Sequence, residues 1–460
     1  MTMKVLLINP PWTIKRRNIW AKIGGVLPPL SLGYLAAVVR ERGVDVKILD
    51  LNALQIPADR AGEHLRDARY DWIGITATTN LAHNARIIAA LARQEQPQAK
   101  IVFGGVHPTV LPEEVLSWPE VDYVVRGEGE VTFTELVTGA PIAGIAGLSY
   151  RREREMVHNP PRELLPDLDA LPFPAYDLLP LGRYVPALGG YQRLPAISVI
   201  TSRGCSGQCS YCNNFYGRKV RKRSAGNVIA ELKLLQERYG IKEIYFFDDS
   251  FTEFPSKVQA LCEQMTAARL DLTWSCFARF NLVNPELLRA MKAAGCHHAS
   301  YGIESGDPQL LEGVRKSSNL DRIRQVMAMT RAAGIDILLG FMLGLPGETL
   351  KTMERTMQFA LELDPDMVLF DITTPFPGTE LFAWAKSQGL LKSENWSDYD
   401  LYTPLLSLPT VSEAEIMRFY SQAHRRFYLR PGYLARRLLK VRSYQDLRQD
   451  LIAFLTILGL

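Results

Sequence analysis

The sequence predicts an α/β protein: a doubly wound, Rossmann-like domain, then a partial or full (β/α) barrel of the TIM type, then a helical C-terminal tail. Two observations carry this prediction. Short apolar runs typical of buried parallel strands alternate with segments of helical spacing over residues 1–140, and again over 196–385. Residues 141–195 hold many prolines and little periodicity, as in a linker, and residues 386–460 form the helical C-terminal region.

The first region supplies the elements of the doubly wound sheet. Strands are predicted at 4–9, 44–51, 71–78, 100–105 and 121–130, and helices at 30–43, 84–96 and 111–118. Ligands of such sheets bind at the carboxyl ends of the strands. Those ends carry the candidate binding residues Pro10, Thr76, Thr78, Gly104, Gly105, His107, Gly127 and Glu128.

Residues 196–385 repeat a strand–helix unit. Strands are predicted at 196–201, 241–249, 272–279, 297–305, 335–346 and 366–375, and helices at 225–238, 255–268, 285–294, 320–333 and 349–363. The repetition predicts a barrel, whose chemistry belongs at the C-terminal ends of its strands. A loop with three cysteines follows the first strand directly, so it lies at such an end.

The composition excludes several classes of protein. The chain has 460 residues, of which 47% are hydrophobic and 22% charged, as in ordinary globular proteins. A net charge of +4 is small for this length, so nucleic acid is not expected as a partner. The first apolar run is too short for the core of a signal peptide, and no apolar stretch approaches the ~20 residues that span a bilayer. Six cysteines, three of them clustered, fit a reducing compartment, so we expect a cytoplasmic protein.

Cys205, Cys209 and Cys212 form a C-x3-C-x2-C run, the most informative feature of the chain. Three thiolates at this spacing are suited to three corners of a [4Fe–4S] cluster, with one iron left open to a small-molecule ligand. Structural zinc is an alternative, but it requires four ligands, and the next cysteine lies fifty residues further on. A disulfide is disfavoured in a chain without secretory features.

With Tyr211 before the last cysteine, this run resembles the signature of the radical S-adenosylmethionine (SAM) enzymes. The resemblance implies that the three cysteines ligate the cluster, that SAM chelates the open iron, and that Tyr211 lies near the adenine. One electron from the cluster then cleaves SAM to a 5′-deoxyadenosyl radical. A reducing protein such as a flavodoxin or ferredoxin is the implied partner.

Four charged residues at later strand ends are candidates for binding SAM. Asp248 and Asp249 stand where many relatives carry a Gly-Gly-Glu turn that receives the SAM ammonium, and an N-cap for the next helix is the alternative. Arg279 and Glu304 would by resemblance hold other polar groups of SAM, and an ion pair inside the barrel is the alternative.

Two further groups of residues admit a binding or a structural interpretation. The basic stretch from Arg218 to Arg223 is suited to a substrate carboxylate or phosphate, although a solvated loop is the more common outcome. Cys296, His297 and His298 have the composition of a metal site, but adjacent strand residues point to opposite faces, which favours a structural role.

Four segments of the first region, "LLINPP", "PPLSLGYLAAVVRERGVDVKILD", "IVFGGVHPT" and "DYVVRGEGE", resemble the cobalamin-binding domain that precedes the barrel in one large radical SAM subfamily. The resemblance implies that the strand-end residues given above contact cobalamin, with Gly104 and Gly105 allowing a close approach. A tight turn is the alternative for these glycines. The D-x-H-x-x-G motif that supplies a histidine to cobalt is missing, since the chain reads Trp12-Thr13-Ile14-Lys15 there. His107 is the remaining candidate ligand.

The C-terminal tail combines basic and apolar residues. Residues 412–428 have helical spacing with Tyr420 and Phe427 on an apolar stripe, and seven basic residues between Arg425 and Arg442 precede the apolar end "LIAFLTILGL". This order is typical of a surface that touches anionic lipid, so a peripheral membrane contact is one interpretation. A terminal helix docked on the barrel is the other.

Taken together, the resemblances imply a cobalamin-dependent radical SAM enzyme. The adenosyl radical would abstract hydrogen from an unactivated carbon of a small-molecule or lipid-like substrate, and methylcobalamin would donate a methyl group to it. One alternative is oxidative cyclisation or rearrangement, as in the anaerobic porphyrin-ester cyclases. Others are a cobalamin-free radical SAM oxidoreductase and a binding protein with a non-catalytic cluster. Nothing in the sequence identifies the substrate.

Overall fold

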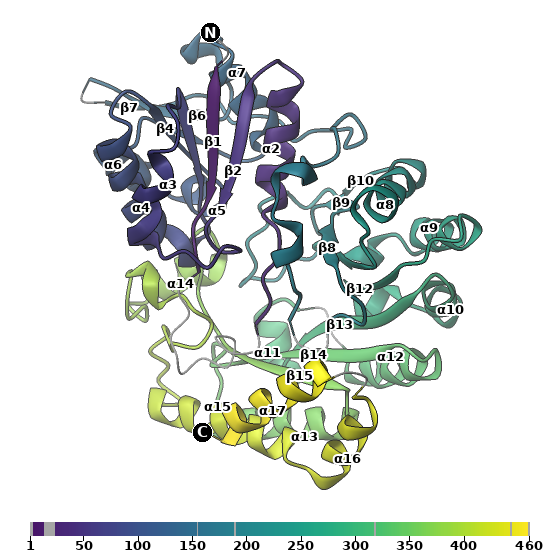
Figure 1. Cartoon of the computed structure of the whole chain (residues 1–460). Helices are drawn as coiled ribbons and strands as arrows, with labels where there is room; N and C mark the ends of the chain where they lie inside the picture. The colour runs from purple at the N-terminus through teal and green to yellow at the C-terminus, as the bar shows by residue number, and fades with distance from the viewer. Residues whose placement is uncertain are drawn as a thin grey trace.

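Two β-sheets lie side by side in the protein, and the C-terminal helices pack below the second sheet (Figure 1). The computed structural model describes residues 3–12, 24–153, 155–187, 190–316, 319–441 and 444–458. The predicted α/β class and the order of its parts are confirmed.

The first sheet has seven strands in the order β2-β1-β3-β4-β5-β6-β7. Its parallel strands are β1 (Lys4–Asn9), β2 (Asp45–Asp50), β3 (Trp72–Thr76), β4 (Lys100–Gly104) and β5 (Tyr123–Val125). Helices α3 (Ala61–Leu65), α4 (Ala82–Glu95), α5 (Val106–Val110) and α6 (Pro112–Ser117) follow β2, β3 and β4, whereas α2 (Leu30–Arg40) and α7 (Gly129–Val137) follow β1 and β5.

Alternation along β1 explains why the sheet is covered on both faces. Leu6 and Ile8 enter the core beneath α3 and α4, whereas Val5 and Leu7 enter the core beneath α2 and α7. The strand order reverses between β1 and β3, which is the switch point at which doubly wound sheets bind ligands. The carboxyl ends of β1 and β3 are therefore the expected site, and those of β4 and β5 follow beside β3 in the sheet.

The segment predicted as a linker, 141–195, contains regular structure. Strands β6 (Leu148–Arg152) and β7 (Glu155–His158) extend the first sheet as an antiparallel pair beside β5. Leu148 and Tyr150 are buried while Arg151 and Arg152 are exposed, so this short strand protects the edge of a parallel sheet. Because the apolar run is only three residues long and prolines follow it, its periodicity was too weak to predict a strand.

The second sheet is a partial barrel of six parallel strands in the order β15-β14-β13-β12-β11-β8. They are β8 (Ala196–Val199), β11 (Glu243–Phe246), β12 (Thr273–Phe277), β13 (Cys296–Glu304), β14 (Asp336–Leu343) and β15 (Met367–Ile372). Between them run α8 (Ala225–Tyr239), α9 (Pro255–Ala267), α10 (Pro285–Ala293), α11 (Pro308–Gly313), α12 (Leu320–Ala332) and α13 (Leu350–Leu363).

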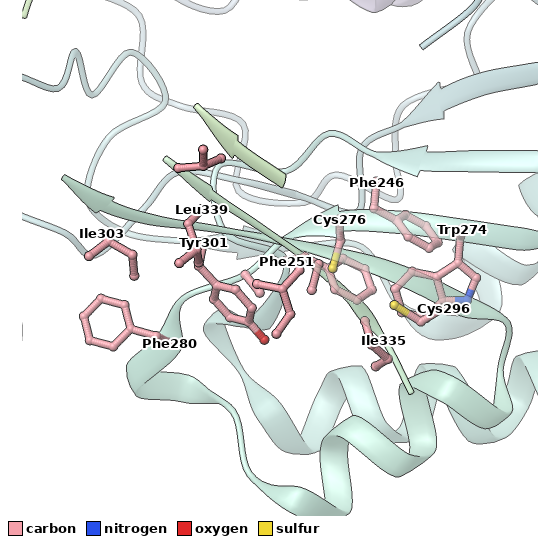
Figure 2. Close-up of a cluster of buried hydrophobic side chains, with 14 of the residues drawn as sticks. Phe246, Phe251, Trp274, Cys276, Phe280, Cys296, Tyr301, Ile303, Ile335 and Leu339 are labelled. Carbon is pink, nitrogen blue, oxygen red and sulfur yellow. The ribbon is translucent and has the colours of Figure 1, made fainter. Parts of the chain in front are cut away.

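The main core of the barrel lies between the strands and the outer helices, as Figure 2 shows for Phe246, Trp274, Cys276 and Tyr301. These side chains are at most 1% exposed. Since successive strand residues point to opposite faces, their neighbours in the sequence face the lumen of the barrel.

The C-terminal region forms α14 (Glu380–Ser387), α15 (Glu413–Tyr428), α16 (Pro431–Leu439) and α17 (Tyr444–Leu458). Helix α15 docks on the edge strand β15, where the Tyr428 hydroxyl donates to the Val368 carbonyl at 2.6 Å and accepts from its N–H at 3.0 Å.

Several basic residues of the tail pair with acidic residues of the barrel. Arg430 and Arg436 pair with Asp364, and Lys440 pairs with Asp336 and Asp366. This favours the docked alternative for the tail; Arg442 lies outside the described residues. None of the described helices has the length and apolar character needed to cross a bilayer.

Candidate active site

The cysteine loop begins where Asp248 anchors the end of β8. The carboxylate accepts hydrogen bonds from the Thr201 N–H at 3.1 Å, from the Thr201 hydroxyl at 2.8 Å and from the Ser202 hydroxyl at 2.5 Å. Burial raises the pKa of Asp248, and these hydrogen bonds oppose the rise. The carboxylate of Asp248 therefore holds the loop in place, and the N-cap alternative is wrong because Phe254 caps the next long helix. A contact between SAM and the backbone carbonyl of Asp248 stays a prediction.

Asp249 stands beside the same loop but is less enclosed. Its carboxylate accepts from the Gly204 N–H at 3.0 Å, and burial raises its pKa. Gly204 has φ +97°, and a Cβ there would lie 2.8 Å from the Gly217 carbonyl oxygen. Only glycine fits this close crossing, which brings the two ends of the loop together.

The loop gathers the three clustered thiols. Burial, together with the neighbouring Cys209 and Cys205, raises the pKa of Cys212 to about 11. None of the three is in a disulfide, so the disulfide alternative is wrong. The other cysteines, Cys262, Cys276 and Cys296, are buried in the core and supply no fourth ligand. Within the described ranges, no three His, Cys, Asp or Glu side chains converge on a single-ion site. The arrangement disfavours zinc and suits a larger cluster with an open corner.

Tyr211 lies in a charged pocket at the end of β13. Burial raises its pKa strongly, as do the nearby Glu304 and Cys209. Glu304, with φ +71°, accepts a hydrogen bond from Lys316 at 2.8 Å. Burial lowers the pKa of Lys316, but Glu304 and Cys209 outweigh it and keep the ammonium charged. Lys316 was missed by the sequence analysis, because it follows Glu304 by twelve residues with no motif between them.

Arg279 reaches the cysteine loop from the end of β12. Its Nη1 lies 2.7 Å from the Ser206 hydroxyl and 3.3 Å from Oε2 of Glu253. Arg279 and Glu304 do not pair with each other, but each forms an ion pair inside the barrel, Arg279 with Glu253 and Glu304 with Lys316, so the structural alternative is supported for both. The charge of Arg279 also lowers the pKa of Lys316, so both cations border the same space as the thiols.

A cavity of about 310 Å³ lies between the first domain and the cysteine loop. The predicted residues that line it are Thr76, Thr78, Gly104, Gly105, Gly127 and Glu128. The barrel contributes Arg203, Asn213, Phe215, Tyr216 and Asp249. Because Asn213 directly follows Cys212, the cavity and the cluster loop share one wall.

The two glycines after β4 have different roles. A Cβ on Gly105, whose φ is +102°, would lie 2.8 Å from the Ala77 carbonyl oxygen, so the tight-turn alternative holds for this residue. A Cβ on Gly104 would meet nothing nearer than 3.8 Å, and one on Gly127 nothing within 4 Å. Gly104 and Gly127 thus leave room that a side chain would fill, as a cradle for a bulky cofactor requires.

Two predicted residues do not line this cavity. Pro10 is not among its lining residues. His107 is fully buried, with Nδ1 3.4 Å from the Thr79 hydroxyl and its ring 5.4 Å from that of Trp396. Burial lowers its pKa to about 4. The prediction of His107 as a cobalt ligand is therefore wrong, and no histidine lines the cavity in the part of the chain described; residues 13–23, where the histidine motif is missing, lie outside it.

A buried ion-pair network joins the two domains beneath the cavity. Glu128 binds Arg203 and Arg221, each at 2.7 Å, and Glu130 binds Arg203 at 2.6 Å. All four side chains are at most 6% exposed. Burial raises the pKa of Glu128, but the two arginines outweigh it and lower the pKa below the usual value. Glu128 therefore positions the cysteine loop. Neither Arg221 nor Arg223, which pairs with a buried glutamate of α8, belongs to a solvated loop.

Both halves of the chain match known protein families. Residues 16–137 match the B12 binding domain, and residues 199–360 match the Radical SAM superfamily. The cavity described above lies between these two matched regions.

The chain is also similar to known proteins over nearly its whole length. An uncharacterized methyltransferase of Pyrococcus horikoshii is 36% identical, with 94% of each chain covered. The anaerobic magnesium-protoporphyrin IX monomethyl ester cyclase of Rubrivivax gelatinosus is 26% identical, covering 94% of this chain and 78% of the cyclase. Among solved structures, the radical SAM methyltransferase TsrM from Kitasatospora setae, with cobalamin and a [4Fe–4S] cluster bound, has a TM-score of 0.69 at 21% identity, covering 91% and 82% of the two chains.

Proposed function

Because this chain belongs to the radical SAM superfamily, in the group that carries a B12 binding domain, we propose that it methylates an unactivated carbon of a small molecule. Two relatives support methyl transfer as the reaction class: the 36% identical uncharacterized methyltransferase, matched over 94% of its length, and a 28% identical cytidylyl-2-hydroxyethylphosphonate methyltransferase of Streptomyces wedmorensis.

The residues present fit the cofactors that this function needs. Cys205, Cys209 and Cys212 would hold the [4Fe–4S] cluster, and the glycine-lined interdomain cavity would hold cobalamin. Glu304, Lys316, Arg279 and Asp249 would bind the charged groups of SAM. When bound, the cluster supplies the electron that cleaves SAM, and cobalamin supplies the methyl group.

The chain's own residues would orient these groups and exclude water. The Lys316–Glu304 pair keeps both charges beside Tyr211, ready to meet the carboxylate and ammonium of SAM. Arg279 ties the cysteine loop to β12, and the Glu128–Arg203 pair ties it to the first domain. Cys212 is the most exposed of the three thiols, which suits electron delivery by a small reducing protein such as a flavodoxin or ferredoxin.

One observation carries the proposal: the cluster loop and the glycine-lined cavity share the wall formed by Asn213, Phe215 and Tyr216. A cobalamin-free radical enzyme has no need of a cavity bounded by Gly104 on one side and by the residues after Cys212 on the other. A non-catalytic cluster likewise has no need of the charged residues Glu304, Lys316 and Arg279.

The test is the metal content of the protein purified anaerobically from cobalamin-replete cells. We expect about four irons and about one cobalt per chain. Iron without cobalt would remove methyl transfer from cobalamin and leave the radical alone. Neither metal, in a protein with its native circular dichroism spectrum, would contradict the proposal altogether.

The anaerobic cyclase among the relatives favours one competing function, oxidative cyclisation. The products separate the two. Methyl transfer yields S-adenosylhomocysteine together with 5′-deoxyadenosine, whereas cyclisation yields 5′-deoxyadenosine without S-adenosylhomocysteine. Chromatography of the small-molecule products after turnover in a native extract distinguishes them.

A further inference from the structure

The lumen of the barrel encloses a larger cavity, of about 570 Å³, that is separate from the interdomain cavity proposed for cobalamin. Its walls come from lumen-facing strand residues and from the C-terminal helices α15, α16 and α17. Aromatic and aliphatic side chains dominate these walls, for example Tyr245, Phe277, Leu338 and Phe454. A cavity of this size with apolar walls is of the kind that binds small molecules.

The upper end of this cavity adjoins the candidate active site. Phe247 and Phe277, whose rings lie 5.9 Å apart, belong to its lining. Each precedes a residue of the active site by two positions, Asp249 and Arg279 respectively. Two residues of chain span at most about 7 Å. A molecule in the lumen therefore extends toward the space bordered by Arg279 and the cysteine loop.

His298 is the one strongly polar side chain of β13 on this wall, and it has no partner. It is 4% exposed, and neither ring nitrogen makes a hydrogen bond to any described residue. Burial and the adjacent His297 lower its pKa to about 3, so the ring is neutral, with one donor and one acceptor. His297, by contrast, binds Glu243 at 2.6 Å. A buried polar group without a partner is unfavourable, which indicates that a ligand completes His298.

The opposite end of the cavity opens between α16 and α17. Leu438, Leu447 and Leu451 line the cavity and are nevertheless 66%, 46% and 54% exposed. Exposed leucines at a cavity mouth are costly in water and provide an apolar path inward. Arg437 also borders the cavity, at the same end.

We propose that this lumen cavity binds the methyl acceptor, and that the acceptor is a lipophilic molecule with one hydrogen-bonding group held by His298. It enters between α16 and α17 with its apolar part along the leucines, and its reacting carbon extends past Phe247 and Phe277. That the bound molecule is a methyl acceptor rests on the proposed function. Binding of a lipophilic molecule in the lumen cavity does not depend on turnover.

The experiment compares dodecan-1-ol with dodecane, which differ only in the hydroxyl. Both are titrated into the anaerobic holoenzyme loaded with a fluorescent apolar dye, and displacement gives their dissociation constants. We expect the alcohol to bind about tenfold more tightly, the ratio that one net hydrogen bond provides. In His298→Phe, which keeps the ring volume, the alcohol should lose its advantage over dodecane, because its hydroxyl no longer finds a partner.

A matched pair of leucine variants tests the location of the mouth. Leu451→Asp should weaken both ligands by about tenfold or more, since it places a charge in the apolar path. Leu350→Asp, at a leucine of α13 with a similar exposure of 48%, should leave binding unchanged. Equal effects of the two variants, or no displacement by either ligand from the wild type, would overturn the inference. Iron and cobalt contents measured on the same samples report separately on the proposed function.

Discussion

The two cavities of this protein are built from different material. The interdomain cavity, about 310 Å³, is formed by strand-end glycines and rests on a buried network of glutamates and arginines. The lumen cavity, about 570 Å³, is formed by aromatic and aliphatic side chains around one unpaired histidine. A cavity built from backbone and fixed charges is suited to cofactors that stay bound, whereas a cavity with apolar walls is suited to a substrate that must enter and leave. If the two assignments proposed above hold, the cofactors bind where the two domains meet and the substrate binds inside the barrel.

Removal of a predicted cluster ligand should have the largest effect on cofactor binding. Cys209→Ala should lower the iron content from about four per chain to near zero, because two thiolates do not hold a cubane cluster. Reductive cleavage of SAM should then be undetectable, while dodecan-1-ol binding in the lumen is retained. Cys262→Ala, at a buried cysteine of α9, is the control and should keep its iron. Full iron in the Cys209 variant would show that the cluster lies elsewhere.

Substitutions in the buried ion-pair network between the two domains should have the next largest effect. Arg203→Met leaves Glu130 without an arginine in a site where both side chains are at most 6% exposed. Stranding a buried charge costs about 3–5 kcal/mol, so the Tm should fall markedly and cobalamin should be lost with it. Arg324→Met, which breaks a pair whose arginine is 41% exposed, should change neither. Equal Tm values for the two variants would contradict a structural role for the network.

The stability of the fold should depend on pH through one buried carboxyl group of the barrel. Glu348, in the turn after β14, accepts from the Gly344 N–H at 2.6 Å and the Leu345 N–H at 3.0 Å. Burial raises its pKa to about 7, above the 4.5 of the unfolded chain. Its proton therefore stabilises the fold fully below pH 4.5, and the contribution is lost as pH rises through 7. A shift of this size corresponds to about 3 kcal/mol.

Glu348→Gln isolates that contribution. The amide oxygen still accepts a backbone hydrogen bond, but the side chain no longer ionises. Thermal unfolding at pH 5 and at pH 8 should show the variant gaining stability relative to the wild type only at pH 8. The same difference at both values would mean that Glu348 is ionised in the fold throughout. Because His298 is neutral over this range, dodecan-1-ol binding should not change with pH.

The same contrast explains what could be predicted from the sequence. Strand and helix periodicity, the cysteine spacing and Gly104 are local signals, so the fold was predicted correctly, and six of the residues predicted at strand ends line one cavity beside the cysteine loop. The carboxylate of Asp248 and the ring of His107 were misassigned because a strand-end position does not reveal whether a side chain points to a ligand or into a hydrogen-bond network. The lumen cavity could not be predicted, since its walls combine residues from Gly25 to Ile457 that meet only in the folded chain.

The mildest prediction concerns the glycines of the interdomain cavity. Gly104→Val adds a side chain where the nearest atom is 3.8 Å from the Cβ position, so the fold should tolerate it. The added methyl groups nevertheless occupy space that we assign to cobalamin, and cobalt per chain should fall by about tenfold at limiting cobalamin. Gly226→Ala, in α8 with nothing within 4 Å of its Cβ position, is the control and should keep its cobalt. If Gly104→Val keeps both its Tm and its cobalt, cobalamin does not lie against β4, and the division between the two cavities must be redrawn.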